Sequence, residues 1–172
     1  TLTFYKNKIA CGGYRGEIIV MDLYSQSNKE IFTCTNSKVT SLSFLDTNTL
    51  IVGSEDGFVH LLNLNKNYSK QINTPFTTIK QLLHLKNTKY IIAHANTTNI
   101  ALIDIKKCKV SSSSYMSFKI DIESVEIINH ELLEVSLKDN STQHVKISNV
   151  DKLKSLIIHN SRYEAYEQIN KE

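Results

Sequence analysis

Residues 50–64 read LIVGSEDGFVHLLNL, which is the pattern of a β-hairpin. An apolar strand over 50–52 is followed by a polar turn, and a second strand with apolar side chains covers 59–62. The turn contains the pair Asp56-Gly57, and Asp-Gly favours a tight turn because glycine adopts a positive φ without a side-chain clash. We therefore predict that Asp56 and Gly57 shape this turn.

Three other segments of the chain align with this hairpin, at 9–23, 91–105 and 132–147, so that the four segments start 41 residues apart. A period in the low forties is the length of one four-stranded propeller blade. Gly16 stands where Gly57 stands one period later, and it is expected to form the same turn. The fourth segment carries one additional residue in its turn.

Between the hairpins the sequence holds pairs of further strand-like stretches. They cover 29–34, 39–44, 68–73, 79–85, 110–117 and 122–128. Short strands with turn signals every 8–12 residues indicate an all-β propeller, sandwich or barrel, and the 41-residue period selects the propeller. The predicted fold is all-β, with blades that are four-stranded antiparallel sheets.

The stretch GSEDGFVHLLNL over 53–64 resembles the core pattern of the WD-repeat family, and 19–23 and 102–105 resemble its closing strand. The resemblance implies that Asp56 orders its turn by hydrogen bonds within its own blade. Some positions depart from the family. Met21, Leu62 and Ile103 stand where the family prefers Trp, and Asn36-Ser37 stands where it has a Gly-His pair. The network that this pair anchors is therefore expected to be missing, which leaves blades held mainly by apolar packing.

The WD-repeat resemblance covers 1–149, which we interpret as about four blades of a partial propeller. The first blade is expected to be incomplete, because 1–5 corresponds to the end of the strand at 42–44 one period later. Four blades rarely close a ring, and an open propeller leaves unpaired strand edges. We expect the rest of the propeller to come from upstream sequence or from another chain.

The pattern changes in residues 150–172, which are expected to form a C-terminal α-helical segment. Asp151 is a candidate cap for a helix from Lys152 to about Lys171, with a break at Asn160-Ser161. The stretch 156–167 resembles the start of the helical hairpins in vesicle-tethering and membrane-coat subunits, where a propeller precedes an α-solenoid. Whether such a solenoid follows Glu172 stays open.

Composition and motifs predict a protein without enzymatic activity, cofactor or metal. The six histidines show no H-x-x-x-H spacing, and the three cysteines are widely spaced with no C-x-x-C. The net charge of +3 is spread along the chain without the basic stripe of a nucleic-acid-binding protein. No apolar run approaches the ~18 residues of a transmembrane span. Reduced thiols indicate an intracellular protein, cytoplasmic or nuclear.

The remaining candidate surface is the propeller face that carries the hairpin turns. Tyr14, Glu55 and Asn96 occupy the same turn position in three repeats, and in WD-repeat proteins this face is a common docking site. We therefore interpret the chain as a protein-interaction scaffold, a subunit of a larger intracellular complex whose partners are other proteins. The alternative is a vesicle-tethering or membrane-coat subunit. Any peripheral membrane association would come through partners.

Overall fold

The computed structural model describes residues 1–25, 29–86, 88–95, 97–129, 131–150 and 153–159. These residues form sixteen strands in four antiparallel sheets, each built from four consecutive strands. The strands are β1 (Leu2–Tyr5), β2 (Lys8–Gly12), β3 (Glu17–Asp22), β4 (Lys29–Thr33), β5 (Val39–Asp46), β6 (Thr49–Ser54), β7 (Val59–Asn63), β8 (Tyr68–Ile72), β9 (Ile79–His84), β10 (Tyr90–Ala95), β11 (Asn99–Asp104), β12 (Lys109–Ser117), β13 (Ile122–Asn129), β14 (Leu132–Leu137), β15 (Thr142–Val150) and β16 (Leu153–His159).

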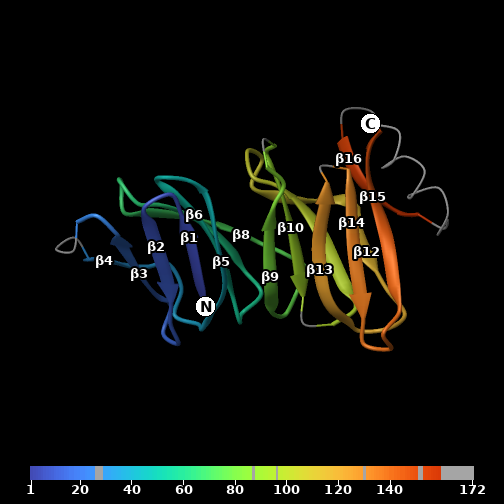
Figure 1. The fold of residues 1–172 in the computed structure, drawn as a ribbon, viewed down its shortest axis with the longest axis horizontal. Coiled ribbons are helices and arrows are strands. Elements are labelled where there is room, and N and C mark those ends of the chain that lie inside the picture. The colour runs from blue at the N-terminus through green and yellow to red at the C-terminus, as the bar shows by residue number, and fades with distance from the viewer. Residues whose placement is uncertain (26–28, 87, 96, 130, 151–152, 160–172) are drawn as a thin grey trace.

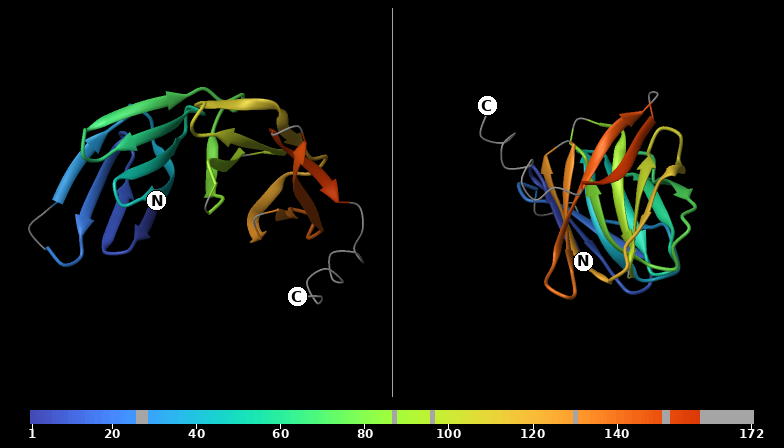
Figure 2. Two further views of the ribbon diagram at one scale, coloured as in Figure 1. Left: turned by 90° about the horizontal axis from the view of Figure 1, so that it is seen from above. Right: turned by 90° about the vertical axis from the view of Figure 1, so that its right-hand side faces the viewer.

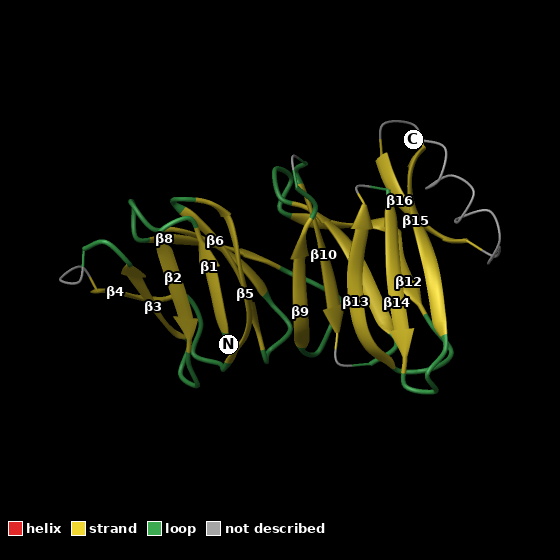
Figure 3. Ribbon diagram, viewed as in Figure 1, coloured by secondary structure: helices red, strands yellow, loops and turns green. Residues whose placement is uncertain are grey.

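The four sheets follow one another along an open arc, with the first sheet (β1–β4) at one end and the fourth (β13–β16) at the other (Figures 1 and 2). Strands β1, β5, β9 and β13 line the concave side, and each contacts the next along the arc. The described part of the chain consists of strands and loops only (Figure 3). The arrangement is that of a partial propeller and is not a closed ring.

The four hairpins expected from the sequence are all present, as β2–β3, β6–β7, β10–β11 and β14–β15. The six further stretches are strands as well. At the N-terminal end, residues 2–5 form the inner strand β1 of the first sheet and pair with β2. β1 has four residues, whereas the equivalent inner strands β5, β9 and β13 have eight, six and eight.

The prediction of a helix that begins at Lys152 is wrong for the residues that the structure describes. Leu153–His159 form strand β16, which pairs with β15 from His144 through Val150. Without β16 the long strand β15 would expose a full row of unpaired backbone groups, and this pairing outweighs the roughly helical spacing of the apolar residues. The fourth sheet therefore extends past the expected boundary at 149. Residues 160–172, which hold the rest of the predicted helix, lie outside the described residues.

Apolar side chains pack between each pair of neighbouring sheets. In β6, Leu50 and Val52 pack against the first sheet, while Ile51 between them packs against the third. This alternation follows from the two-residue period of a strand, which places successive side chains on opposite faces. The inner sheets are consequently apolar on both faces, and three separate cores hold the arc together.

One backbone hydrogen bond recurs in all four sheets and fixes the true period. It runs from the amide of Leu23 to Asn7, and again from Leu64 to Asn48, Ile105 to Lys89 and Ile147 to Glu131. These positions are 41, 41 and 42 residues apart, so one additional residue is present in the fourth repeat. Each of the four bonds joins residues 16 apart, so the additional residue lies between Ile105 and Glu131, and the prediction that it lies in the fourth turn is wrong. A shift of one residue exchanges the two faces of a strand. Leu133, and not Leu132, therefore takes the buried place of Ile91.

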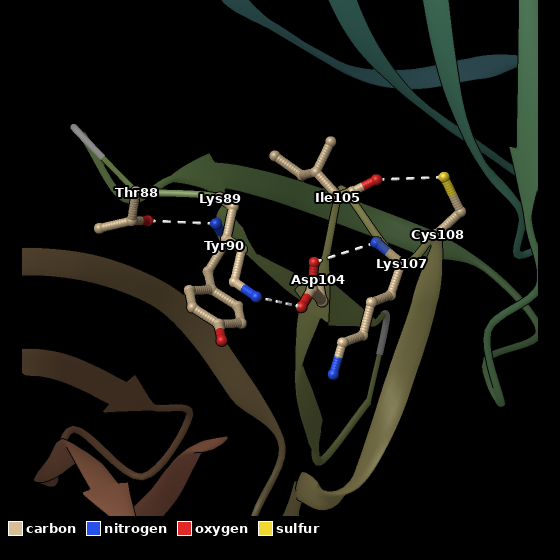
Figure 4. Close-up of polar contacts among 7 residues, drawn as sticks. All are labelled: Thr88, Lys89, Tyr90, Asp104, Ile105, Lys107 and Cys108. Carbon is tan, nitrogen blue, oxygen red and sulfur yellow. Dashed lines mark hydrogen bonds and ion pairs between the residues drawn. The ribbon is translucent and has the colours of Figure 1, made fainter. Parts of the chain in front are cut away.

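A carboxylate at the end of β11 ties together the two turns at this end of the third sheet (Figure 4). Asp104 accepts hydrogen bonds from the Lys89 ammonium at 2.8 Å and from the Lys107 amide at 3.1 Å. Burial disfavours the charged form of Asp104, but the hydrogen bonds from Lys89 and Lys107 outweigh it and lower the pKa of the carboxyl. Asp22 has the same role in the first sheet. Its carboxylate accepts hydrogen bonds from the side-chain amide of Asn7, which stands at the position of Lys89, and from the backbone amide of Tyr24.

We expect Asp104→Ala to lower the free energy of unfolding by about 1–3 kcal/mol, because it leaves the Lys107 amide and the Lys89 ammonium without their acceptor. Chemical denaturation measures the change. The matched control is Lys107→Ala, since only the backbone of Lys107 takes part in the contact. Equal effects of the two substitutions would contradict this role for the Asp104 carboxylate.

A second prediction concerns acid stability. His94 is fully buried in β10, and burial together with the positive charge of Lys80 lowers its pKa to about 4. Below pH ~6.5 the unfolded chain binds a proton that the folded state does not, so stability is lost as the pH falls from ~6.5 towards 4. The loss from His94 reaches about 3 kcal/mol near pH 4. His94→Leu should flatten this part of a melting-temperature profile, and an unchanged slope would be evidence against it.

Candidate interaction face

The turns that join β2 to β3, β6 to β7, β10 to β11 and β14 to β15 lie at one end of their sheets, and we call the surface that they form the turn face. Three of these turns close with the same type of backbone hydrogen bond. The amides of Gly13, Ser54 and Leu137 donate to the carbonyls of Glu17, Phe58 and Ser141. The repeat thus presents equivalent turn residues side by side along the arc.

Asp56 is the most connected side chain of the turn face. Its carboxylate accepts hydrogen bonds from the hydroxyl of Ser54, from the hydroxyl of Thr35 at 3.0 Å and from the amide of Phe58 at 3.4 Å. Burial disfavours ionisation, but the hydrogen bonds from Ser54, Ser37, Phe58 and Thr35 together lower the pKa of Asp56. Asp56 therefore holds its own turn and also the link between β4 and β5, from which Thr35 and Ser37 come.

A polar network is present at this turn although the Gly-His pair of the family is absent. Thr35 donates to Asp56, and its hydroxyl oxygen accepts from the amide of Ser37 at 3.1 Å. Hydroxyl groups thus serve as donors to the turn carboxylate in this sheet. Sequence comparison with the family pattern missed them because it searched for a histidine at one position and not for donors of another type nearby.

Gly16 and Gly57 are needed at the turn face for two reasons. Their φ angles are 76° and 82°, in the left-handed region that favours glycine. A Cβ atom would also lie 1.8 Å from the carbonyl oxygen of Thr35 at Gly16, and 2.0 Å from that of Phe76 at Gly57. The segment that leads from one sheet to the next thus passes directly over each turn.

Two of the three predicted contact residues, Tyr14 and Glu55, are both in contact with Lys38. Tyr14 is 77% exposed, and the Lys38 ammonium lies 4.7 Å from its ring centroid. The carbonyl of Lys38 accepts a hydrogen bond of 2.9 Å from the amide of Glu55, whose side chain is exposed. Asn96 lies outside the described residues. Lys38 was missed because no repeat position marks it, although it precedes a predicted strand.

A second concave surface lies on the inner side of the arc. A cavity of about 680 Å³ opens between β1, β5, β9 and β13. Its lining residues include Tyr5, Leu83, Lys6, His84 and Lys86. It lies beside the strand ends opposite the turn face.

Among the described residues, no group of three or more His, Cys, Asp or Glu side chains is placed to hold a metal ion. The same part of the chain has no helix that is long and apolar enough to cross a membrane.

We expect Asp56→Ala to destabilise the protein by about 1–3 kcal/mol, because Ser54, Thr35 and the Phe58 amide lose a shared acceptor. Thermal or denaturant unfolding measures this loss. Glu55→Ala serves as the control, since it removes a neighbouring carboxylate that is exposed as Asp56 is but accepts none of these hydrogen bonds. An unfolding curve of Asp56→Ala that coincides with that of the control would rule out the anchoring role.

Comparisons with known proteins agree with this architecture. No curated protein matches the sequence. The chain is similar to the crystal structure of the computationally designed Ika4 protein, with a TM-score of 0.73 and 19% sequence identity over 86% of this chain and 89% of that one, a likeness of fold. The family model of the CFAP43 N-terminal domain matches residues 2–117, which are strands β1 to β12. Since this match covers more than half of the sequence, the chain belongs to the CFAP43 N-terminal domain family, a family of WD-repeat-containing proteins.

Proposed function

We propose that this chain is a non-enzymatic interaction scaffold that binds another protein through its turn face, as part of a larger assembly. The observation that carries the proposal is the arrangement of Tyr14, Lys38 and Glu55. The family name supports a role among cilia- and flagella-associated proteins.

The Tyr14 ring has the properties of a binding anchor. Tyrosine is enriched among the residues that contribute most to protein interfaces, because a large rigid ring buries much area at a low cost in conformational entropy. Here the ring is exposed, and the Lys38 ammonium lies over its face within the range of a cation–π contact. Glu55 adds a carboxylate at the same turn position of the next sheet. A partner with an apolar pocket and a basic group beside it would match this surface.

The carboxylates of the turns support a binding role over a catalytic one. Glu17, Asp56 and Asp139 each accept hydrogen bonds within their own turns, and each has a pKa below its usual value. A general acid or base works best with a pKa near the working pH. These three groups are ionised at neutral pH and are occupied as acceptors.

The alternative of a vesicle-tethering or membrane-coat subunit is not proposed. It rested on the resemblance of residues 156–167, of which 156–159 belong to strand β16 and 160–167 lie outside the described residues. The family match does not point to such proteins.

The test measures partner binding by the full natural protein and by its Tyr14→Ala variant. If Tyr14 is an anchor, the substitution costs about 2 kcal/mol of binding, which corresponds to about a 30-fold weaker affinity. Co-purification with the native assembly identifies the partner, and titration calorimetry or surface plasmon resonance gives the affinity. Tyr24→Ala is the control, because Tyr24 is also highly exposed but follows β3 at the opposite end of the sheet. Equal affinities of the two variants would exclude the turn face as the binding surface.

A further inference from the structure

A continuous groove runs along the concave side of the arc, at the strand ends opposite the turn face. Figure 2 shows the concave side from above. The cavity of about 680 Å³ described above continues into a second one of about 310 Å³, because His84, Lys86 and Ile127 line both. Together the two cavities extend from β1 past β5 and β9 to β13. We call this continuous depression the inner groove.

One wall of the inner groove is a pair of aromatic rings with a cation above it. The ring centroids of Tyr5 and Phe44 lie 6.0 Å apart, so the first and second sheets share this wall. The Lys6 ammonium lies 5.6 Å from the centroid of the Tyr5 ring, within the range of a cation–π contact. The Lys6 side chain therefore folds back over the preceding residue, which keeps its charge beside the groove.

The other wall comes from the end of β9. Leu83 and His84 are half-buried there, and the Nε2 atom of His84 lies 3.3 Å from the carbonyl oxygen of Thr88. This contact holds the imidazole ring in place at the groove. Lys86 follows β9 and is exposed. Ile127 of β13 lies at the far end, so the wall combines apolar and basic side chains.

The charges along the inner groove have one sign. Its described lining residues include Lys6, His84 and Lys86 and contain no aspartate or glutamate. Within the part of the chain that the structure describes, neither of the two ammonium groups forms a salt bridge. Asp46, at the end of β5, accepts a hydrogen bond of 2.8 Å from the amide of Asn48 in its own turn. The groove is therefore complementary to an anion.

The shape and the apolar walls indicate what kind of anion fits. A small anion is best held by donors that converge in an enclosed site, whereas Lys6 and Lys86 are exposed and follow different strands. A nucleic acid is held by a longer series of phosphate contacts than two lysines provide. An acidic peptide fits both features of the groove. Its apolar side chain is buried against Tyr5 and Leu83 while its carboxylates reach the two ammonium groups.

We propose that the inner groove binds an acidic segment of a partner protein. The segment lies across the strand ends, with an apolar side chain between β1 and β9 and with carboxylates at Lys6 and Lys86. This site is separate from the turn face and goes beyond the function proposed above. Partner binding through Tyr14 can therefore fail while the inner groove still binds its peptide, and the reverse also holds.

A labelled peptide tests the chemistry of the occupant. The probe is a fluorescein-labelled peptide of repeated Glu-Glu-Leu units, and fluorescence anisotropy measures its binding to the full natural protein at low ionic strength. We expect saturable binding that weakens as salt is added, because exposed charge pairs are screened. Replacing Glu by Gln, or Leu by Ser, should weaken it about tenfold.

Three outcomes of this experiment would overturn the proposal. The first is the absence of saturable binding. The second is equal affinity for a peptide of repeated Lys-Lys-Leu units, since the charge of the groove would then have no part in binding. The third is displacement of the acidic peptide by an equal concentration of a thymidine oligonucleotide, which would indicate a nucleic-acid site instead.

Charge reversal locates the site. The double substitution Lys6→Asp and Lys86→Glu should weaken peptide binding about tenfold or more, because each attraction becomes a repulsion. Aspartate suits position 6 because it tolerates the left-handed φ of 53° found there. The matched control is Lys66→Glu with Lys107→Glu, which makes the same change in charge at two exposed lysines in the β7–β8 and β11–β12 turns. Equal affinities of the two double variants would show that binding is non-specific.

A cross-linking peptide gives a readout that depends on no substitution in the protein. With a benzophenone in place of one leucine, the peptide should label residues of the inner groove such as Tyr5 and Leu83, as identified by mass spectrometry. Labels confined to the turn face, at Tyr14 or Glu55, would overturn the proposal even if the peptide bound tightly. They would assign the acidic peptide to the turn face instead.

Discussion

Face-to-face packing of apolar sheets is the interaction on which the structure depends. A four-stranded sheet with apolar side chains on both sides, such as the second one, cannot be stable alone in water. Each of its faces needs a neighbouring sheet, and the buried side chains supply the main favourable free energy, about 25 cal/mol for each Å² of apolar area removed from water. Ile51 and Leu50 illustrate the constraint, because adjacent residues of one strand are both fully buried on opposite sides.

The polar contacts set the spacing that this packing requires. The backbone hydrogen bond that Leu23 donates to Asn7, and that recurs in each sheet, fixes each hairpin at one end. At the other end, the segments that connect the sheets pass close over Gly16 and Gly57, which fixes the links between sheets. Side chains join the inner strands directly. Ser41 accepts from the amide of Leu82 at 2.9 Å, and Gln81 in the next sheet bonds to Val125. Such contacts align each sheet with its neighbour, so that the turn residues lie in a regular row.

Much of the architecture could be predicted from the sequence because the repeat is long and regular. The hairpins and the connecting strands follow from alternation and turn residues. The fourth repeat was harder, since its additional residue was expected in the turn near Asp139 but lies before Glu131, which changes the register of the whole hairpin and brings Leu133 to the buried face. β16 was missed because pairing with β15 is a tertiary effect that overrides local spacing. At the turn face, Tyr14 and Glu55 could be found from their equivalent positions, whereas Lys38 and the hydroxyl donors required the path of the connecting segment.

The pairing of consecutive strands bears on how such a chain can fold. Among the described strand pairs the widest, Asn99 with Ser117, spans only 18 residues. Every sheet is thus assembled from contacts that are local in the sequence, and the contacts between sheets join segments about one repeat apart. Loop closure costs rise with sequence separation, so this topology keeps them small. A ribosome that releases the chain from its N-terminal end delivers each sheet complete before the next one emerges, and each new sheet finds its packing surface already formed.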